Sequence, residues 1–274
     1  MNAEVRPLRP EDVGWLADLH NLAFGDYPVP AVLDEPALRQ YLIETDVDLA
    51  LSRVALVEDR PVSFCLGAIR GRRASIRGEG TAPGYRRRGL GRRVLDETLA
   101  ALAAAGAGEV CLEVLNGNDG ATHLYQRTGF ERRRRLLGYS LQRPRTQGVR
   151  SRLAGRPAPL EVGEALDRIT SWGWNYPHWQ LEPPSLAHLP ALAFGRYAVA
   201  LGKGRGERFW LYALAVDPAH RRHGLATRAL SHLPATYVGV PALLPEDWWE
   251  AGALMRAVGA MTESHWQWEM RREL

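Results

Sequence analysis

A basic turn that contains glycine and opens a helix occurs twice in this chain, and it constrains the fold more than any other feature. The first copy is Arg86–Gly91 (RRRGLG) and the second is Arg221–Ala226 (RRHGLA). Backbone N–H groups at such a turn, together with the helix dipole, favour a bound phosphate. Two copies about 135 residues apart therefore predict a duplicated phosphate-binding domain.

Length and composition fit two globular domains. The 274 residues allow each half to bury a core, and 46% of them are hydrophobic. No run approaches the roughly 18 apolar residues that span a bilayer, and residues 1–10 lack a signal peptide's apolar core. We therefore expect no membrane segment and a cytoplasmic location.

The cysteines and histidines predict no metal site. Cys65 and Cys111 lie in apolar, strand-like runs and are expected to be reduced core thiols. Four histidines of the second half, His178, His188, His220 and His223, lack metal-ligand spacing.

The net charge of +4 comes almost entirely from arginine, since Lys203 is the single lysine. We interpret this as compositional bias. The alternative is a nucleic-acid surface, for which Arg132–Arg135 is the densest basic cluster. The 31 acidic residues and the modest net charge argue against a dedicated nucleic-acid binder.

Periodicity and turn signals predict an α/β (α+β) fold in each half. In the first half, helices are expected at residues 13–22, 36–43, 90–105 and 119–127, and strands at 5–8, 51–58, 62–70, 74–81, 110–115 and 136–141. In the second half, helices are expected at 161–172 and 226–233, and strands at 197–201, 209–216 and 266–270. The predicted domains are residues 1–145 and 159–274, with a linker at 146–158 that is rich in Pro, Gly and Arg.

The first half resembles the GCN5-related N-acetyltransferases (GNAT), which bind acetyl-coenzyme A. It carries the family's turn signature as Arg86, Gly89 and Gly91. A second signature follows at the expected separation: Asn118, Ala121, Leu124-Tyr125 and Gly129-Phe130. The resemblance implies two tandem domains, each a mixed, mostly antiparallel splayed sheet flanked by helices.

The second half matches only the turn signature. Its Met255, Gly259 and Ala260 stand where the first half has Tyr125, Gly129 and Phe130. The asparagine and the tyrosine are absent, so we interpret this half as a degenerate copy of the same fold.

The resemblance also implies which residues bind the cofactor. In the first half they are Gly80, Thr81, Arg86, Arg87, Arg88, Gly89, Leu90, Gly91, Arg92 and Asn118. A possible second site comprises Val216, Arg221, Arg222, His223, Gly224, Leu225 and Ala226. For Asn118, capping of the following helix is an equally good explanation.

Tyr125 is the expected general acid, because a phenol with a pKa near 10 suits proton donation to a thiolate. Two glutamates compete for the role of base. Glu113 precedes Tyr125 by twelve residues, a spacing that resembles the ribosomal-protein alanine acetyltransferases, but it is equally explained as a solvent-facing strand residue. Glu79 lies on the preceding strand and is the alternative.

The aromatic segment Trp172–Trp179 is expected to pack between the halves, with an acceptor pocket as the alternative. For the whole chain we expect an acetyl-coenzyme A-dependent N-acetyltransferase, without a metal, that acetylates a primary amine in its first half by direct transfer. Two alternatives remain open: catalysis in the second half, and a coenzyme A-binding sensor or scaffold without turnover.

Overall fold

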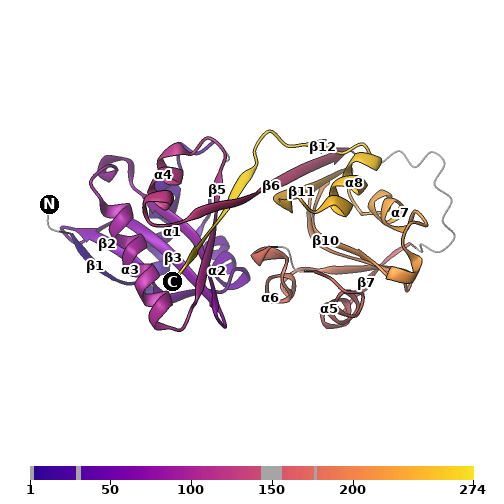
Figure 1. Cartoon of the computed structure of the whole chain (residues 1–274), viewed down its shortest axis with the longest axis horizontal. Coiled ribbons are helices and arrows are strands. Elements are labelled where there is room, and N and C mark those ends of the chain that lie inside the picture. The colour runs from indigo at the N-terminus through magenta and orange to yellow at the C-terminus, as the bar shows by residue number, and fades with distance from the viewer. Residues whose placement is uncertain (1–2, 29–31, 143–155, 176–177) are drawn as a thin grey trace. The chain divides into compact units, whose positions relative to one another are not determined.

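The computed structural model describes residues 3–28, 32–142, 156–175 and 178–274 (Figure 1). The chain forms two compact units. Unit 1 comprises Met1–Arg133 and Glu269–Leu274, and unit 2 comprises Arg134–Trp268. Within the described ranges, no helix is long and apolar enough to cross a membrane.

Unit 1 contains a sheet in which the strands lie in the order β1-β2-β3-β4-β5-β13. Neighbours from β1 to β4 are antiparallel, whereas β5 runs parallel to β4. The strands are β1 (Glu4–Pro7), β2 (Val47–Val57), β3 (Arg60–Arg70), β4 (Arg73–Thr81), β5 (Glu109–Leu115) and β13 (Gln267–Glu273), of which the last enters unit 1 at Glu269.

Helices cover both faces of this sheet. They are α1 (Val13–Ala23), α2 (Glu35–Glu44), α3 (Leu90–Ala104) and α4 (Asp119–Arg127). Leu16 of α1 joins Phe64 of β3 in one buried cluster. Gly67 of β3 lies instead against Leu102 of α3. Because side chains alternate between the two faces of a strand, α1 lies on one face of the sheet and α3 on the other.

Unit 2 repeats this plan with the strand order β6-β11-β10-β9-β8-β7, and a short β12 also pairs with β6. Its strands are β6 (Glu131–Gln142), β7 (Pro157–Leu160), β8 (Ala191–Phe194), β9 (Ala198–Arg205), β10 (Arg208–Val216), β11 (Tyr237–Pro245) and β12 (Met261–Thr262). Its helices are α5 (Val162–Ser171), α6 (Pro183–Leu186), α7 (Leu225–Ser231) and α8 (Trp249–Ala257). As in unit 1, one pair of strands, β10 and β11, is parallel while β9 is antiparallel to β10. The predicted fold class, a mixed and mostly antiparallel sheet flanked by helices in each half, is confirmed.

The units differ from the predicted domains because a strand is exchanged between the halves. The sequence predicts that β6 closes the first half, but from Arg134 onward β6 belongs to unit 2, where it pairs with β11. The sequence predicts that β13 closes the second half, but Glu269–Leu274 belong to unit 1. There the Leu274 amide donates to the Gly108 carbonyl at 3.1 Å. An exchanged strand has the same alternating pattern as one that stays in its own half, so periodicity does not distinguish the two arrangements.

The predicted domain boundary at 146–158 falls mainly outside the described residues, which resume at residue 156. The expected linker ends earlier than predicted, because Pro157–Leu160 forms β7 and pairs with β8.

Candidate active site

The two basic turns have the same backbone conformation. Arg87 and Gly89 have positive φ angles of 58° and 81°, and Arg222 and Gly224 have φ angles of 63° and 74°. This region costs little at glycine but is uncommon for other residues. Its occurrence at an arginine in both turns shows that the two segments are built alike, as the repeated sequence predicts.

The first arginine of each turn holds the turn in place. Arg86 donates to the carbonyls of Thr81 and Ala23 at 3.1 and 2.8 Å, and it also pairs with Asp26. Arg221 makes the same two kinds of bond, each at 3.1 Å, to the end of β10 and to the residue that ends α5. These guanidinium groups therefore connect strand, helix and turn. The next two residues of each turn are exposed: Arg87 and Arg88 in unit 1, and Arg222 and His223 in unit 2.

The two parallel strands next to each turn, β4 with β5 and β10 with β11, are paired at one end and separate toward the other. The last pair between β4 and β5 is Ile76 with Leu112, and the last pair between β10 and β11 is Trp210 with Gly239. Beyond these pairs, residues 77–81 of β4 and 211–216 of β10 have no strand partner on that side among the described residues. Such an edge can pair with an extended ligand through main-chain bonds. Gly80 and Thr81 lie on it, as the predicted cofactor role requires.

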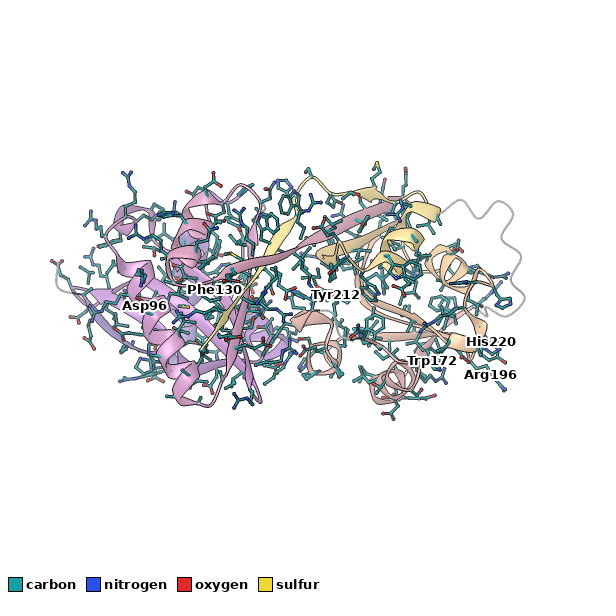
Figure 2. All side chains as sticks on the ribbon, viewed as in Figure 1. Asp96, Phe130, Trp172, Arg196, Tyr212 and His220 are labelled. Carbon is teal, nitrogen blue, oxygen red and sulfur yellow. The ribbon has the colours of Figure 1, made fainter. Side chains whose placement is uncertain are left out.

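Tyr125 and Glu79 come together beside this edge. The Tyr125 hydroxyl donates to Glu79 Oε2 across 3.5 Å, a long contact of the kind that can tighten when substrate binds. The tyrosine is 6% exposed, and its ring packs against Phe130 with centroids 6.0 Å apart. Figure 2 labels Phe130 among the side chains of unit 1. The position of Tyr125 on α4 and the packing of its ring hold the phenol in place. The half-buried Glu79 faces the phenol from β4.

Burial changes the ionisation of both groups. It raises the pKa of Glu79 to about 7, against the opposing effects of the Tyr125 hydrogen bond and the Arg86 charge. Burial, together with the negative charge of Glu79, raises the pKa of Tyr125 well above its usual value. The site therefore combines a protonated phenol with a carboxyl group that titrates near neutral pH, a combination suited to proton transfer.

Glu113 occupies a different environment from Glu79. Its Oε2 accepts from Arg77 Nη1 at 2.7 Å, and the two side chains are 9% and 3% exposed. These residues directly follow the last β4–β5 pair, so the ion pair spans the strands where they part. Tyr41 of α2 donates to the Arg77 carbonyl. Of the two candidate bases, Glu79 contacts Tyr125, whereas Glu113 is held by Arg77.

The remaining predicted cofactor residues surround the turn of unit 1. Asn118 caps α4 by accepting from the Ala121 amide at 3.2 Å. Leu90 is buried below the turn, and Arg92 pairs with Asp96 at 2.6 Å along α3. Capping is thus a role of Asn118 in this structure, and the side chain of Arg92 bonds both to its own helix and, at 3.4 Å, to the Arg127 carbonyl at the end of α4.

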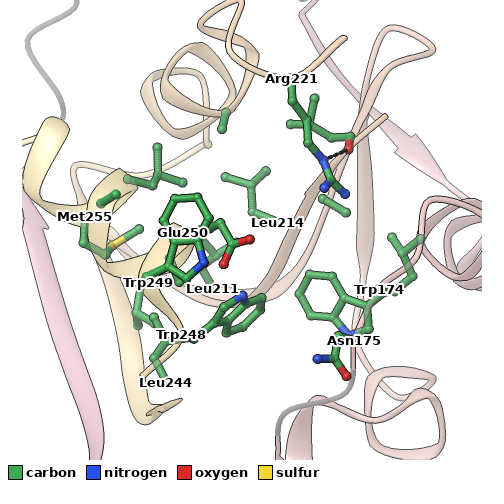
Figure 3. Close-up of a pocket in the computed structure, with 18 of the residues that line it drawn as sticks. Trp174, Asn175, Leu211, Leu214, Arg221, Leu244, Trp248, Trp249, Glu250 and Met255 are labelled. Carbon is green, nitrogen blue, oxygen red and sulfur yellow. Dashed lines mark hydrogen bonds between the residues drawn. The ribbon is translucent and has the colours of Figure 1, made fainter. Parts of the chain in front are cut away.

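Unit 2 contains a cavity of about 860 Å³ between β10, α8 and the end of α5 (Figure 3). Apolar side chains form most of its wall, including Leu211, Leu214, Leu244 and Met255. Trp174 and Trp248 also line it, edge to face with centroids 5.6 Å apart. Of the possible second cofactor site, all but His223 line this cavity: Val216, Arg221, Arg222, Gly224, Leu225 and Ala226.

Met255 takes the place of Tyr125 in unit 2. Both are the seventh residue of a nine-residue helix, α4 or α8. Phe130 donates its amide to the Tyr125 carbonyl at 3.0 Å, and Ala260 does the same to Met255 at 2.9 Å. The glycine before each donor has positive φ, 89° at Gly129 and 73° at Gly259. The two helix ends are therefore equivalent, and unit 2 carries a thioether where unit 1 carries a phenol.

A model of the Acetyltransferase (GNAT) family matches residues 16–130 and 171–236, which include both basic turns. The chain belongs to this family. The match confirms the resemblance predicted from the two signatures, and it covers both halves of the chain.

Solved structures of GNAT proteins share the fold over nearly the whole chain. A tandem GNAT protein from the clavulanic acid biosynthesis pathway superposes with a TM-score of 0.72 at 16% identity, covering 99% of this chain and 98% of that one. A GCN5-related N-acetyltransferase from Sphaerobacter thermophilus gives a TM-score of 0.67 at 15% identity, covering 99% and 95%. One from Kribbella flavida gives 0.67 at 14%, covering 100% and 71%. At identities this low the likeness shows the fold alone. No curated protein matches the chain.

Within this GNAT chain, part of the aromatic segment of the second half lines the cavity of unit 2. Trp172 and Trp174 line the cavity of unit 2, and Trp179 is buried in the same unit at 1% exposure. Residues 176 and 177 of this segment lie outside the described residues. The structure thus agrees with the alternative in which part of the segment lines a pocket.

Sequence reasoning missed two residues next to the candidate site of unit 1, Arg77 and Tyr41. An arginine inside a buried strand is itself a signal, because charged side chains are almost never fully buried unless paired. The thiols behave as predicted: Cys65 and Cys111 are free and buried. Burial raises the pKa of both, to about 12 at Cys111, which keeps them protonated and weakly nucleophilic. The described residues contain no group of three or more His, Cys, Asp or Glu arranged to hold a metal.

Proposed function

We propose that unit 1 transfers an acetyl group from acetyl-coenzyme A to a primary amine within a ternary complex. The observation that carries this proposal is the contact between Tyr125 and Glu79 beside the free edge of β4, the strand that leads into the first basic turn. Membership of the GNAT family supports an acyl-coenzyme A donor. Acetyl as the acyl group and a primary amine as the acceptor belong to the proposal.

Main-chain groups would hold the donor. Gly80 and Thr81 offer an unpaired strand edge to its pantetheine arm, and the turn Arg86–Gly91 offers backbone N–H groups to its pyrophosphate. Arg87 and Arg88 are exposed and add positive charge at the same turn. Holding thioester and amine in line removes much of the entropic barrier, since effective molarities in oriented systems reach about 10⁵ M or more.

The side chains would move the protons. The neutral amine nitrogen attacks the thioester carbonyl, which forms the C–N bond and leaves a positive charge on nitrogen; the C–S bond then breaks. Glu79 accepts a proton from that positively charged nitrogen, directly or through water, and Tyr125 gives its proton to the departing sulfur. The proton on Glu79 then restores the phenol across the 3.5 Å contact, so that one proton passes from nitrogen to sulfur. A substrate that arrives as an ammonium first loses one further proton to solvent.

Glu79 fits the role of base better than Glu113. Its pKa of about 7 gives a carboxylate that is both present and basic at neutral pH. Glu113 is engaged by Arg77, and a buried guanidinium stabilises the charged, weakly basic form of a carboxylate. We therefore assign Glu113 a structural role at the strand junction, the point just after the last β4–β5 pair where the two strands separate.

A second function is favoured for unit 2: coenzyme A binding without turnover. Its turn has the backbone of the first turn and borders a cavity of about 860 Å³, while Met255 supplies no proton where Tyr125 would. Under this proposal, unit 2 has the sensor or scaffold role and unit 1 carries out catalysis.

The two turns can be tested separately in the full chain. Replacing Gly89 or Gly224 with Glu strains a backbone whose φ is 81° or 74°, and it places a negative charge in the turn that would bind the phosphate. We expect calorimetry with acetyl-coenzyme A to find two sites, of which G89E and G224E each remove one. Thiol release across a panel of amines should disappear in G89E and persist in G224E.

The reverse pattern of thiol release would move catalysis to unit 2. Two intact binding sites with no thiol release for any amine would replace the transferase with the sensor function.

A further inference from the structure

The geometry points to Gly91 as a positioning residue for the Glu79 carboxylate, beyond the backbone approach that a glycine allows a phosphate. A Cβ atom at position 91 would lie 2.7 Å from Glu79 Oε1 and 3.2 Å from Thr81 Oγ1. Real Cβ atoms essentially never come within 3.0 Å of another heavy atom. The missing side chain at Gly91 therefore provides the space that the carboxylate occupies. This inference rests on the proposed role of Glu79 in unit 1.

The carboxylate is the part of this contact that would move, because it is the end of a flexible side chain whereas the backbone of its strand is held. Its strand is fixed on one side, where Glu79 is the register partner of Cys65. The neighbouring Thr81 hydroxyl is bonded to Ser63 Oγ at 2.8 Å. At its other oxygen, the carboxylate faces the Tyr125 hydroxyl. A methyl group at position 91 would have to displace the carboxylate, and the contact with Tyr125 is what would change.

Unit 2 shows that the turn itself does not require glycine at this place. Ala226 stands five residues after the first arginine of its turn, as Gly91 does in unit 1. The turn of unit 2 nevertheless keeps its positive φ angles at Arg222 and Gly224. Alanine is thus compatible with this backbone.

The strand residues at the positions equivalent to Glu79 and Thr81 are different in unit 2. Counting back seven and five residues from the first arginine gives Glu79 and Thr81 in unit 1, and Leu214 and Val216 in unit 2. Unit 1 thus combines glycine at position 91 with the carboxylate of Glu79, and unit 2 combines alanine at position 226 with the aliphatic side chain of Leu214. The choice at this position therefore follows the neighbour on the strand and not the turn.

Two groups besides Tyr125 face Glu79 and belong to the same electrostatic environment. The Cys65 thiol lies beside it on β3, and burial raises the pKa of that thiol so that it stays neutral. The Arg86 charge favours the ionised carboxylate. A displaced carboxylate would change its distance to all three groups, which makes the pH profile of turnover a direct readout of its position.

The experiment is a double-mutant cycle in the full chain, with G91A, E79A and the double variant, and with Ala226→Gly as the matched control in the other turn. We expect G91A to lower kcat at least about ten-fold and to shift the inflection of the pH–rate profile, because misplacing a catalytic group by about 1 Å can cost 10²-fold. The KM for acetyl-coenzyme A and the affinity for free coenzyme A should change less than about two-fold, since the turn tolerates alanine. In the E79A background, G91A should have no further effect on kcat.

Three results would overturn the inference. They are full kcat in G91A, an equal loss of kcat with and without Glu79, or a loss of coenzyme A affinity that accounts for the loss of turnover; the last would assign Gly91 to the phosphate alone. If E79A itself has full turnover, the proposed base is wrong, and this result is recorded separately from the effect of G91A. Circular dichroism and thermal unfolding of each variant exclude loss of fold as the cause.

Discussion

The two units have the same turn and the same parted strands, but they differ in what lies between the strands. Unit 1 places ionisable groups there: Glu79 with Tyr125, and Arg77 with Glu113. In unit 2, mostly aliphatic, aromatic and thioether side chains line a cavity of about 860 Å³, and the acidic residues that border it, Asp247 and Glu250, are exposed. The difference shows that the GNAT fold does not depend on charged groups at the strand junction. Among the described residues, a buried ion pair at the point where the parallel strands separate occurs in unit 1, and this favours a role in chemistry over a role in folding.

The largest effect should follow from removing the phenol. Tyr125→Phe keeps the ring packed against Phe130 but removes the proton donor, so we expect kcat to fall by about 10²–10⁴. The matched change in unit 2, Met255→Leu, should leave kcat unchanged. Initial rates of thiol release measure both. Equal losses in the two variants, or none in Tyr125→Phe, would remove the functional distinction between the units.

The buried ion pair should have the next largest effect, on stability. Glu113→Gln leaves the Arg77 charge buried without its partner, which costs about 3–5 kcal/mol in comparable pairs. Thermal unfolding should show a Tm lower by about 10 °C.

Replacing both members of the ion pair with apolar residues, as at the equivalent place in unit 2, should recover most of the stability lost in Glu113→Gln. We expect Arg77→Met combined with Glu113→Leu to recover stability, since buried ion pairs can often be replaced by packed apolar residues. A double variant as unstable as Glu113→Gln would show that unit 1 depends on this pair in a way that unit 2 does not.

The third largest effect should be the dependence of kcat/KM on pH. Because burial raises the pKa of Glu79 to about 7, the basic form is lost as the pH falls through that value. We expect kcat/KM to decrease about ten-fold per pH unit below 7 and to level off above it. Glu79→Gln should lower the plateau and abolish this inflection. An inflection that survives in Glu79→Gln would assign it to the amine substrate.

The helix cap should have the smallest effect. Asn118 accepts from the Ala121 amide, whereas the corresponding Trp248 makes no side-chain cap bond to α8. Asn118→Ala should therefore cost about 1 kcal/mol, or a few degrees in Tm. An unchanged KM for acetyl-coenzyme A would assign Asn118 to capping alone. A raised KM would add the cofactor contact that the family resemblance implies.

Much of unit 1 can be predicted from sequence because its signals are local. The 3.6-residue periodicity from Leu90 predicts α3, and Asp119 to Gly129 predicts α4 with its end. In unit 2, Gly239 and Pro241 interrupt the apolar run that forms β11, so that strand has no clear signal. Both basic turns are found because a turn of six residues carries its own signature.

The contacts of the site are less predictable because they depend on register between distant segments. Glu79 and Tyr125 are 46 residues apart, and nothing in their neighbourhood distinguishes Glu79 from Glu113 as a base. The parallel register of β4 and β5 decides it, since that register places Arg77 opposite Glu113. The strand exchange is hidden for a related reason, because β6 and β13 have the same pattern whichever sheet they join.

The strand exchange has a consequence for how the protein is made. Unit 1 includes Glu269–Leu274, so its sheet remains incomplete until synthesis has passed residue 274. At about 5–20 residues per second, the nascent first half waits several seconds or more with the edge of β5 uncovered. Uncovered strand edges pair readily with other chains. We therefore expect a premature stop in the second half to leave the sheet of unit 1 without β13, and each half expressed alone to lack the strand that the other half supplies.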